Sequence, residues 1–199
     1  MLKIILASAS PRRSELLKLI GLDFEIIPAN IKEEFEGNMD AGKYASEMSR
    51  QKAMAVAKEV KGKYNKDTYV LGADTVVVAD NKILGKPKDK NHAYGMLKLL
   101  ENKWHDVITG LTLVNAETLK LSSETEITRV KIPAFSKGFL ERYLASEEPY
   151  DKAGSYGIQG TGSLMVEYIN GCYFNVMGLP LYRLSKMLEK EGYEVLSWI

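Results

Sequence analysis

Residues 69–79 have the sequence Tyr-Val-Leu-Gly-Ala-Asp-Thr-Val-Val-Val-Ala. This nearly continuous apolar and β-branched run predicts a strand buried within a sheet. Asp74 interrupts the run, and a carboxylate is disfavoured in strands and costly to bury unless it is paired or binds a metal. Asp74 is therefore a candidate general base or metal ligand. The alternative interpretation is a carboxylate at a strand end or bulge that accepts hydrogen bonds from nearby backbone amides.

Strand and helix patterns alternate on both sides of this run. We expect further strands at residues 3–7, 24–28, 82–84, 106–115, 120–132, 164–169, 173–177 and 193–197. We expect helices after Ser10 and at residues 40–60, 90–100, 136–145 and 180–191. The Asn170-Gly171 pair favours a hairpin between the strands at 164–169 and 173–177. Because hairpins and crossover helices both occur, the sequence predicts an α/β (mixed α+β) protein with a mixed sheet.

Length and composition are those of a globular protein. The 199 residues fit one domain, or one domain with two lobes. A hydrophobic fraction of 45% and a charged fraction of 27% argue against disorder. The formal net charge of +1 argues against a nucleic-acid partner and against an anionic membrane surface.

Cysteine content and hydropathy favour a cytoplasmic protein. Cys172 is the only cysteine, so no internal disulfide can form, which suits a reducing compartment. No segment approaches the ~20 consecutive apolar residues that a membrane span needs. The apolar stretch in residues 1–10 is too short for the core of a signal peptide. His92 and His105 have no metal-ligand spacing with each other or with Cys172, so we predict ordinary roles for both.

The segment Ser8-Ala9-Ser10-Pro11-Arg12-Arg13 lies between the first strand and the first helix. Ser10 suits the N-cap of this helix and Gly21 its C-terminal cap. A helix N-terminus carries partial positive charge, so two arginines in its first turn are unfavourable unless an anion binds there. Phosphate is also commonly bound where a strand leads through a loop of small residues into the N-terminus of a helix. The alternative is that both arginines point into solvent or pair with Glu15.

Two lysines are further candidates for contact with phosphate. Lys52 lies on the apolar face of the helix predicted at 40–60, where it either extends its ammonium group to solvent or reaches a ligand. Lys86 lies in the tight segment Gly85-Lys86-Pro87, where a lysine can serve as a point charge for phosphate. Glu33 and Glu34 belong to an acidic stretch that is ordinarily a solvated loop.

The glycine-rich segment DKAGSYGIQG at residues 151–160 predicts a loop. Tyr156 could stack on a nucleobase. The amide of Gln159 supplies both a donor and an acceptor, which matches the mixed edge of uracil or thymine. A plain mobile connection is the alternative.

Five segments, in order along the chain, resemble the Maf family of nucleoside triphosphate pyrophosphatases, once described as septum-formation inhibitors. The segments are LASASPRRSELL near the start, Gly72-Ala73-Asp74-Thr75, Gly85-Lys86-Pro87, DKAGSYGIQG and Gly178-Leu179-Pro180. The resemblance implies an ITPase-like mixed sheet flanked by helices, with two lobes around a substrate cleft, in a single domain of residues 1–199. It also implies a homodimer, a divalent cation (Mg²⁺ or Mn²⁺), and cleavage of the α–β phosphoanhydride of a nucleotide to give a monophosphate and pyrophosphate.

The resemblance also implies roles for individual residues. Asp74 would accept a proton from the attacking water, and Glu33 would help Asp74 to hold the metal. The side chains that would hold the triphosphate are those of Ser8, Arg12, Arg13, Lys52 and Lys86. Lys32 stands where relatives usually carry an acid, which leaves the composition of the metal shell open.

Three positions divide the family by substrate. The branch that acts on dTTP and UTP carries Arg, Thr and Gln, which correspond here to Arg12, Thr75 and Gln159. The 7-methyl-GTP branch typically carries Trp, Gln and Glu, and the acidic side chain there suits a cationic base. The resemblance therefore predicts a dTTP/UTP pyrophosphatase, with the order of the two substrates and the acceptance of CTP or modified nucleotides left open. The alternative is a non-enzymatic nucleotide-binding regulator of cell division, which gives Asp74 no task.

Overall fold

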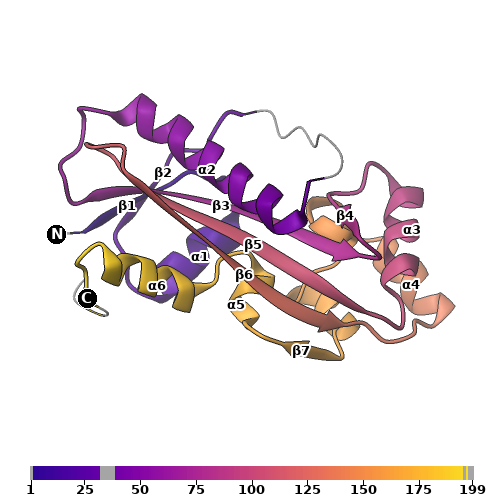
Figure 1. Cartoon of the computed structure of the whole chain (residues 1–199). Helices are drawn as coiled ribbons and strands as arrows, with labels where there is room; N and C mark the ends of the chain where they lie inside the picture. The colour runs from indigo at the N-terminus through magenta and orange to yellow at the C-terminus, as the bar shows by residue number, and fades with distance from the viewer. Residues whose placement is uncertain (1, 32–38, 195, 197–199) are drawn as a thin grey trace. The chain divides into compact units, whose positions relative to one another are not determined.

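The computed structural model of the chain describes residues 2–31, 39–194 and 196 (Figure 1). In this described part, seven strands form one sheet in the order β2-β1-β3-β5-β6-β7, and β4 pairs with β3. The strands are β1 (Lys3–Leu6), β2 (Phe24–Ile26), β3 (Thr68–Ala79), β4 (Lys82–Leu84), β5 (Trp104–Asn115), β6 (Leu121–Lys131) and β7 (Tyr168–Asn170). The α-helices are α1 (Pro11–Leu19), α2 (Ala41–Val60), α3 (Lys90–Leu100), α4 (Lys137–Leu144), α5 (Tyr173–Met177) and α6 (Leu181–Lys190). Short 3₁₀ turns occupy η1 (Glu148–Asp151), η2 (Ala153–Ser155) and η3 (Gly160–Met165).

The sheet is mixed. β1 pairs in parallel with β2 and with β3, so that Ile5 lies opposite Glu25 on one side and Val70 on the other. β4 pairs antiparallel with β3, and β7 pairs antiparallel with β6. The mixed α/β class expected from the sequence is therefore confirmed.

The chain divides into two compact units. The first unit consists of Met1–Asp74, Thr109–Glu126 and Gly178–Ile199. The second unit consists of Thr75–Ile108 and Ile127–Met177. Each unit is built from separate stretches of chain, because β3, β5 and β6 each contribute residues to both.

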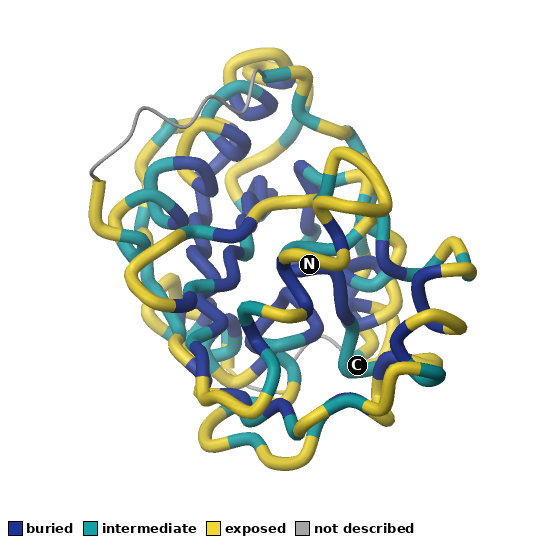
Figure 2. The backbone as a smooth tube through the Cα atoms, turned by 90° about the vertical axis from the view of Figure 1, so that its right-hand side faces the viewer, coloured by how far each residue is buried: buried dark blue, intermediate teal, exposed yellow. Residues whose placement is uncertain are grey.

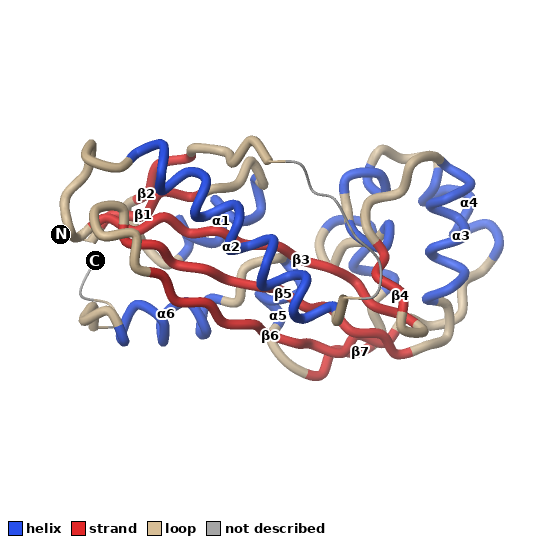
Figure 3. Tube along the Cα trace, turned by 45° about the horizontal axis from the view of Figure 1, so that its top comes forward, coloured by secondary structure: helices blue, strands red, loops and turns tan. Residues whose placement is uncertain are grey.

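In the first unit, α2 packs closely on the sheet. A Cβ atom on Gly72 of β3 would lie 2.1 Å from the carbonyl oxygen of Ser49, and one on Gly110 of β5 would lie 2.2 Å from that of Ala45. Only glycine permits this approach. Figure 3 shows α2 running along β3 and β5. The apolar cluster under α2 contains Ile5, Ala7, Ala53, Val56, Ala57, Val60, Val70, Val114 and Ala116.

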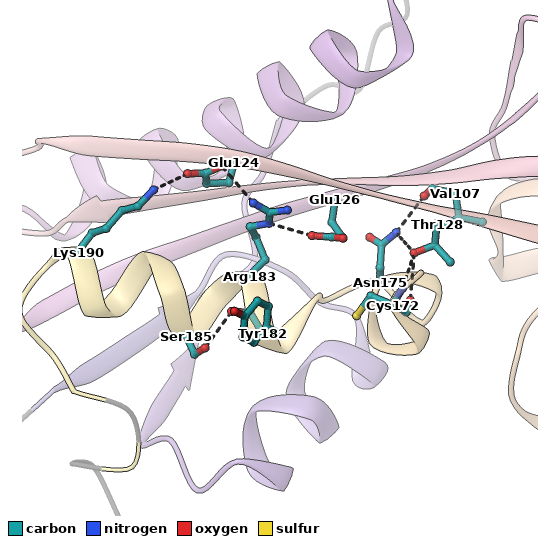
Figure 4. Close-up of polar contacts among 10 residues, drawn as sticks. All are labelled: Val107, Glu124, Glu126, Thr128, Cys172, Asn175, Tyr182, Arg183, Ser185 and Lys190. Carbon is teal, nitrogen blue, oxygen red and sulfur yellow. Dashed lines mark hydrogen bonds and ion pairs between the residues drawn. The ribbon is translucent and has the colours of Figure 1, made fainter. Parts of the chain in front are cut away.

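On the other face of the sheet, the first unit is covered by α1 and α6 (Figure 1). Leu184 and Leu188 of α6 are fully buried. The polar side of α6 is tied to β6 by charged contacts, because Nε of Arg183 donates to Glu126 at 2.8 Å and Nζ of Lys190 donates to Glu124 at 2.8 Å (Figure 4).

The second unit has its own apolar core, in which α3, α4 and the 3₁₀ turns pack against the strands. The core residues are Val77, Ala79, Leu84, Ala93, Leu97, Leu100, Val107, Val130, Ile132, Leu140, Tyr143, Leu144, Tyr156 and Met165. Figure 2 shows buried, intermediate and exposed positions alternating along the backbone. Among the described residues, no helix combines the length and apolar character needed to cross a membrane.

The predicted hairpin around Asn170-Gly171 is wrong, because Tyr173–Met177 is the helix α5 and not a strand. Oγ1 of Thr128 accepts from the backbone N–H of Cys172 at 3.0 Å and donates to its carbonyl at 3.2 Å. The amide of Asn175 donates to Thr128 Oγ1 and to the Val107 carbonyl (Figure 4). Thr128, 44 residues earlier in the chain, therefore satisfies the backbone groups of the residue that precedes α5.

The strand predicted at residues 193–197 is not found in its described part. Tyr193 and Glu194 have no regular structure, and Leu196 lies in a turn with a positive φ of 68°. The other residues of that range lie outside the described part of the chain. The hydroxyl of Tyr193 donates to Asp67 at 3.0 Å, and its ring packs edge-on against Tyr69. Tyr193 is thus attached to β3 and to Asp67 by its side chain, and its backbone N–H donates to the Leu188 carbonyl at 3.0 Å.

Candidate active site

The loop between β1 and α1 brings Ser8 and Arg13 together in the first unit. Ser10 occupies the N-cap position of α1 as expected, but its side chain makes no capping hydrogen bond. Its backbone N–H donates instead to Oγ of Ser8 at 3.2 Å. The first turn of α1 contains no acidic residue. The helix therefore begins with cationic side chains at its positive end, as the sequence predicts.

Arg13 is held firmly inside the first unit. The residue is only 9% exposed, so the alternative that Arg13 points into solvent is wrong. Nη1 donates to Oγ of Ser8 at 3.0 Å, and Nε donates to the carbonyl oxygen of Gly178 at 2.8 Å. These contacts join the first and the last of the segments that resemble the Maf family. The preceding residue, Arg12, is half-buried.

Lys52 and Asp74, each singled out separately in the sequence, form a buried ion pair. Nζ of Lys52 donates to Oδ1 of Asp74 at 2.6 Å, and each residue is 8% exposed. Lys52 therefore does not extend its charge into solvent, and Asp74 is not a strand-end residue, because β3 continues for five residues beyond it. Gly72 explains the pairing, since it lies two residues before Asp74 on the same face of β3 and contacts Ser49 and Ala53 of α2.

The metal ligands predicted from the resemblance are only partly described. The described residues contain no group of three or more His, Cys, Asp or Glu side chains that could hold a metal ion. Glu33 lies outside the described residues. Magnesium in sites that process phosphates is commonly held by one or two carboxylates together with phosphate oxygens of the substrate. Asp74 fits that role as one protein ligand.

In the second unit, the segment that contains Lys86 lies beside the glycine-rich loop. The backbone N–H of Gly154 donates to the carbonyl oxygen of Gly85 at 3.1 Å. Gly154 has a positive φ of 69°, and a Cβ atom there would lie 3.1 Å from Val77 of β3. Lys86 is exposed, and Thr75, which follows Asp74 in β3, is half-buried.

The glycine-rich loop is ordered by its own contacts and is not a plain connection. Gln159 is half-buried just before η3. The carboxylate of Glu148 accepts from the backbone N–H groups of Thr161 at 3.0 Å and of Gly162 at 2.8 Å. Tyr156 is 5% exposed and belongs to the core, so the expectation that its ring stacks on a nucleobase is wrong.

Three residues hold these segments in place in ways that the sequence did not predict, and one of them, His105, was expected to have only an ordinary role. His105 bonds the hydroxyl of Tyr156 through Nε2 at 2.6 Å, Glu148 holds the turn after Gln159, and the carbonyl of Gly178 holds Arg13. Gly178 belongs to one of the quoted segments. No sequence pattern, however, indicates that its backbone carbonyl accepts a hydrogen bond from Arg13. A histidine within a β-branched strand was the one available signal for His105.

Comparisons with known proteins agree with this arrangement of segments. The family model described as Maf-like protein matches residues 3–191. The dTTP/UTP pyrophosphatase of Acetivibrio thermocellus is 50% identical over the full length of both chains. That of Caldicellulosiruptor bescii is 43% identical over 99% of this chain and 98% of its own, and that of a Thermoanaerobacter species is 47% identical over 96% and 97%.

Among solved structures, the Staphylococcus aureus Ham1 protein is 14% identical, with a TM-score of 0.49, over 95% of this chain and 99% of its own. The family is established by the sequence matches, which extend across both units and include every quoted segment. The chain belongs to the Maf family.

Proposed function

We propose that this chain is a nucleoside triphosphate pyrophosphatase that hydrolyses dTTP and UTP to the monophosphate and pyrophosphate. Full-length relatives that are 43% to 50% identical carry the name dTTP/UTP pyrophosphatase. The structural observation that carries the proposal is the buried ion pair of Lys52 and Asp74. Burying two charges costs several kcal/mol of desolvation free energy per ion. Replacing such a pair by apolar side chains of similar volume often leaves a protein as stable or makes it more stable, so stability alone does not account for the pair. A catalytic task for the carboxylate accounts for that cost.

The triphosphate is bound by cationic and hydroxyl groups. Ser8, Arg12 and Arg13 act at the N-terminus of α1, where free N–H groups and the helix dipole also favour an anion. Arg13 is oriented by the carbonyl of Gly178, so its guanidinium is ordered before substrate arrives. Lys52 and Lys86 add two point charges. Such charges lower the barrier by neutralising the negative charge that the phosphate oxygens carry in the transition state.

Asp74 is the general base. Its carboxylate takes a proton from water as the water oxygen bonds to the α-phosphorus, and the bond from that phosphorus to the bridging oxygen breaks to release pyrophosphate. Lys52 donates to one carboxylate oxygen of Asp74, and the second oxygen accepts the proton. Proton transfer of this kind contributes about 10²–10⁴-fold to a rate.

A divalent cation, Mg²⁺ or Mn²⁺, completes the proposed site. Asp74 would hold it together with phosphate oxygens of the nucleotide, and Glu33 is proposed as a second carboxylate from the family resemblance. Bound there, the cation supplies charge neutralisation on the phosphate oxygens.

Gln159, Thr75 and Arg12 select the pyrimidine base. The Gln159 amide presents one donor and one acceptor, which complement the carbonyl and N–H groups of uracil and thymine. The amide is neutral, so it does not attract a cationic methylated guanine. Gln159 lies in a turn whose backbone is fixed by Glu148, which suits a residue that must present its amide in one orientation.

A panel of nucleoside triphosphates with Mg²⁺ or Mn²⁺ tests the proposal, with pyrophosphate and orthophosphate measured separately. We expect pyrophosphate and the monophosphate as first products, with dTTP and UTP preferred to purine nucleotides. Orthophosphate as the first product would overturn the proposed bond cleavage. Nucleotide binding without any hydrolysis would favour a nucleotide-binding regulator, a function that leaves Asp74 without a task.

A further inference from the structure

A buried hydrogen bond in the second unit has no part in the chemistry proposed above. Nε2 of His105, on β5, lies 2.6 Å from the hydroxyl of Tyr156, and the two rings meet edge-on with centroids 5.3 Å apart. The residues are 3% and 5% exposed. Two polar groups so deeply buried have no access to substrate, so their task must be carried out through the backbone to which they belong.

Tyr156 lies three residues before Gln159 in the glycine-rich loop. Gly157 and Ile158 are the only residues between them, so the chain allows Gln159 little travel once Tyr156 is fixed. On the other side of Gln159, the Glu148 carboxylate fixes the backbone N–H groups of residues 161 and 162. Gln159 is therefore held between two anchors, of which Tyr156 is one.

The backbone that leads into Tyr156 adopts conformations that need such an anchor. Ser155 has a positive φ of 63°, which is costly for a residue with a Cβ atom. Its side chain is fully buried, and Oγ donates to Sδ of Met96 on α3 at 3.4 Å. The preceding Gly154 is bonded to Gly85. Surrounding contacts thus hold a strained turn in place, and the His105–Tyr156 bond is one of them.

The protonation of His105 agrees with an anchoring role. Nδ1 is buried and has no hydrogen-bond partner among the described residues. If Nδ1 carries the proton, Nε2 accepts from the Tyr156 hydroxyl, and one donor is left unpaired. The other tautomer leaves both the Tyr156 proton and the Nδ1 lone pair without partners, at greater cost. The hydroxyl of Tyr156 therefore donates to a neutral imidazole.

We propose that the hydrogen bond between His105 and Tyr156 positions Gln159 for recognition of the pyrimidine base, which makes both of them positioning residues for substrate selectivity. The inference rests on the proposed function, because it assigns to Gln159 the contact with the base. Neither residue takes part in the transfer of a proton or in the binding of phosphate.

Substitution Tyr156→Phe removes the hydroxyl and keeps the ring in the core. We expect the KM values for dTTP and UTP to rise about three- to tenfold, as for the loss of one buried hydrogen bond, while kcat at saturation stays within about twofold. The ratio of kcat/KM for dTTP to that for dGTP falls by the same factor. Tyr150→Phe is the matched control, since its half-buried hydroxyl donates to the Leu144 carbonyl at 2.8 Å in the same unit. That variant keeps the selectivity of the unsubstituted chain.

Two further comparisons separate positioning from a general loss of structure. His105→Gln keeps an amide that can meet the Tyr156 hydroxyl, so it retains more selectivity than His105→Leu. In a Gln159→Ala background, Tyr156→Phe has no further effect on the dTTP to dGTP ratio, because Tyr156 acts through Gln159. An active chain whose selectivity is unchanged by Tyr156→Phe, or in which the two substitutions are additive, overturns this inference alone. An unsubstituted chain that hydrolyses neither dTTP nor UTP overturns the proposed function, and this inference with it.

Discussion

At the scale of single residues, the pairing of Lys52 with Asp74 accounts for two anomalies of the sequence at once. A lysine on an apolar helix face and a carboxylate in a buried strand neutralise each other, so neither is buried unpaired. Each could be singled out from its neighbours in the sequence, because the helical spacing of apolar residues around Lys52 and the apolar run around Asp74 are local patterns. Their pairing could not, since it depends on where α2 lies on the sheet.

Replacement of the carboxylate by its amide tests the general base. We expect Asp74→Asn to lower the rate of dTTP hydrolysis by at least ~100-fold, because the amide cannot accept the proton from water. Affinity for a non-hydrolysable dTTP analogue, measured by calorimetry, stays close to that of the unsubstituted chain. Asp106→Asn is the control, since that carboxylate is half-exposed and lies 3.8 Å from Nε of Arg129. Near-normal turnover by Asp74→Asn would remove Asp74 from the role of base.

Removal of the lysine tests the energetics of the pair. We expect Lys52→Met to lower the free energy of unfolding by about 3–5 kcal/mol, because it leaves a buried carboxylate without its partner. The double variant with Asp74→Asn recovers much of that loss, since no unpaired charge is then buried. Urea unfolding at neutral pH measures both effects. Equal destabilisation by the single and double variants would mean that packing, and not charge, dominates at this site.

A pH dependence follows from the burial of His105. Burial lowers the pKa of His105 from 6.5 to about 4, so the folded chain keeps the ring neutral where the unfolded chain protonates it. The unfolded state then binds more protons between pH 6.5 and about 4, and stability falls as the pH falls through this window. The full contribution is about 3 kcal/mol. We expect His105→Gln to flatten the dependence of the free energy of unfolding on pH in this window. If the slope is unchanged, carboxylates and not His105 cause the loss of stability at low pH.

At the scale of elements, the sequence predicted most helices and strands but not their contacts. The bounds of α2 and α3 follow from local signals, since Asp40 and Asp89 cap them by accepting from the backbone N–H groups three residues ahead. α5 could not be predicted, because Thr128, 44 residues before Cys172, takes up the backbone groups of Cys172. Arg13, Lys52 and Asp74 could be singled out as residue types, whereas the contacts of Arg13 with Gly178 and of Lys52 with Asp74 join residues that are distant in the sequence.

The close approach of α2 to the sheet predicts a strong effect of one methyl group. We expect Gly72→Ala to destabilise the chain by about 3 kcal/mol or more, because the new Cβ would lie 2.1 Å from the Ser49 carbonyl oxygen and α2 would have to shift. Activity falls too, since Lys52 moves with α2. Gly95→Ala is the control, because nothing lies within 4 Å of its Cβ position in α3 and alanine favours a helix by about 1 kcal/mol. Thermal unfolding distinguishes the two.

At the scale of the whole molecule, both units are assembled from non-contiguous pieces of chain. Since β3, β5 and β6 each have residues in both units, neither unit can be cut out as one continuous segment. The single domain of residues 1–199 stays a prediction, and it has a calorimetric test. We expect one unfolding transition whose calorimetric enthalpy equals its van't Hoff enthalpy. Two resolved transitions would assign independent stability to the units.

The contact between Arg13 and Gly178 has a consequence for how the protein is made. The guanidinium and the carbonyl that orients it are 165 residues apart, near the two ends of the chain. During translation, Arg13 leaves the ribosome 165 residues ahead of its acceptor. A nascent chain that has not yet exposed Gly178 therefore cannot hold Arg13 in its final orientation, and the phosphate-binding arrangement proposed for Arg13 forms only after Gly178 has been synthesised.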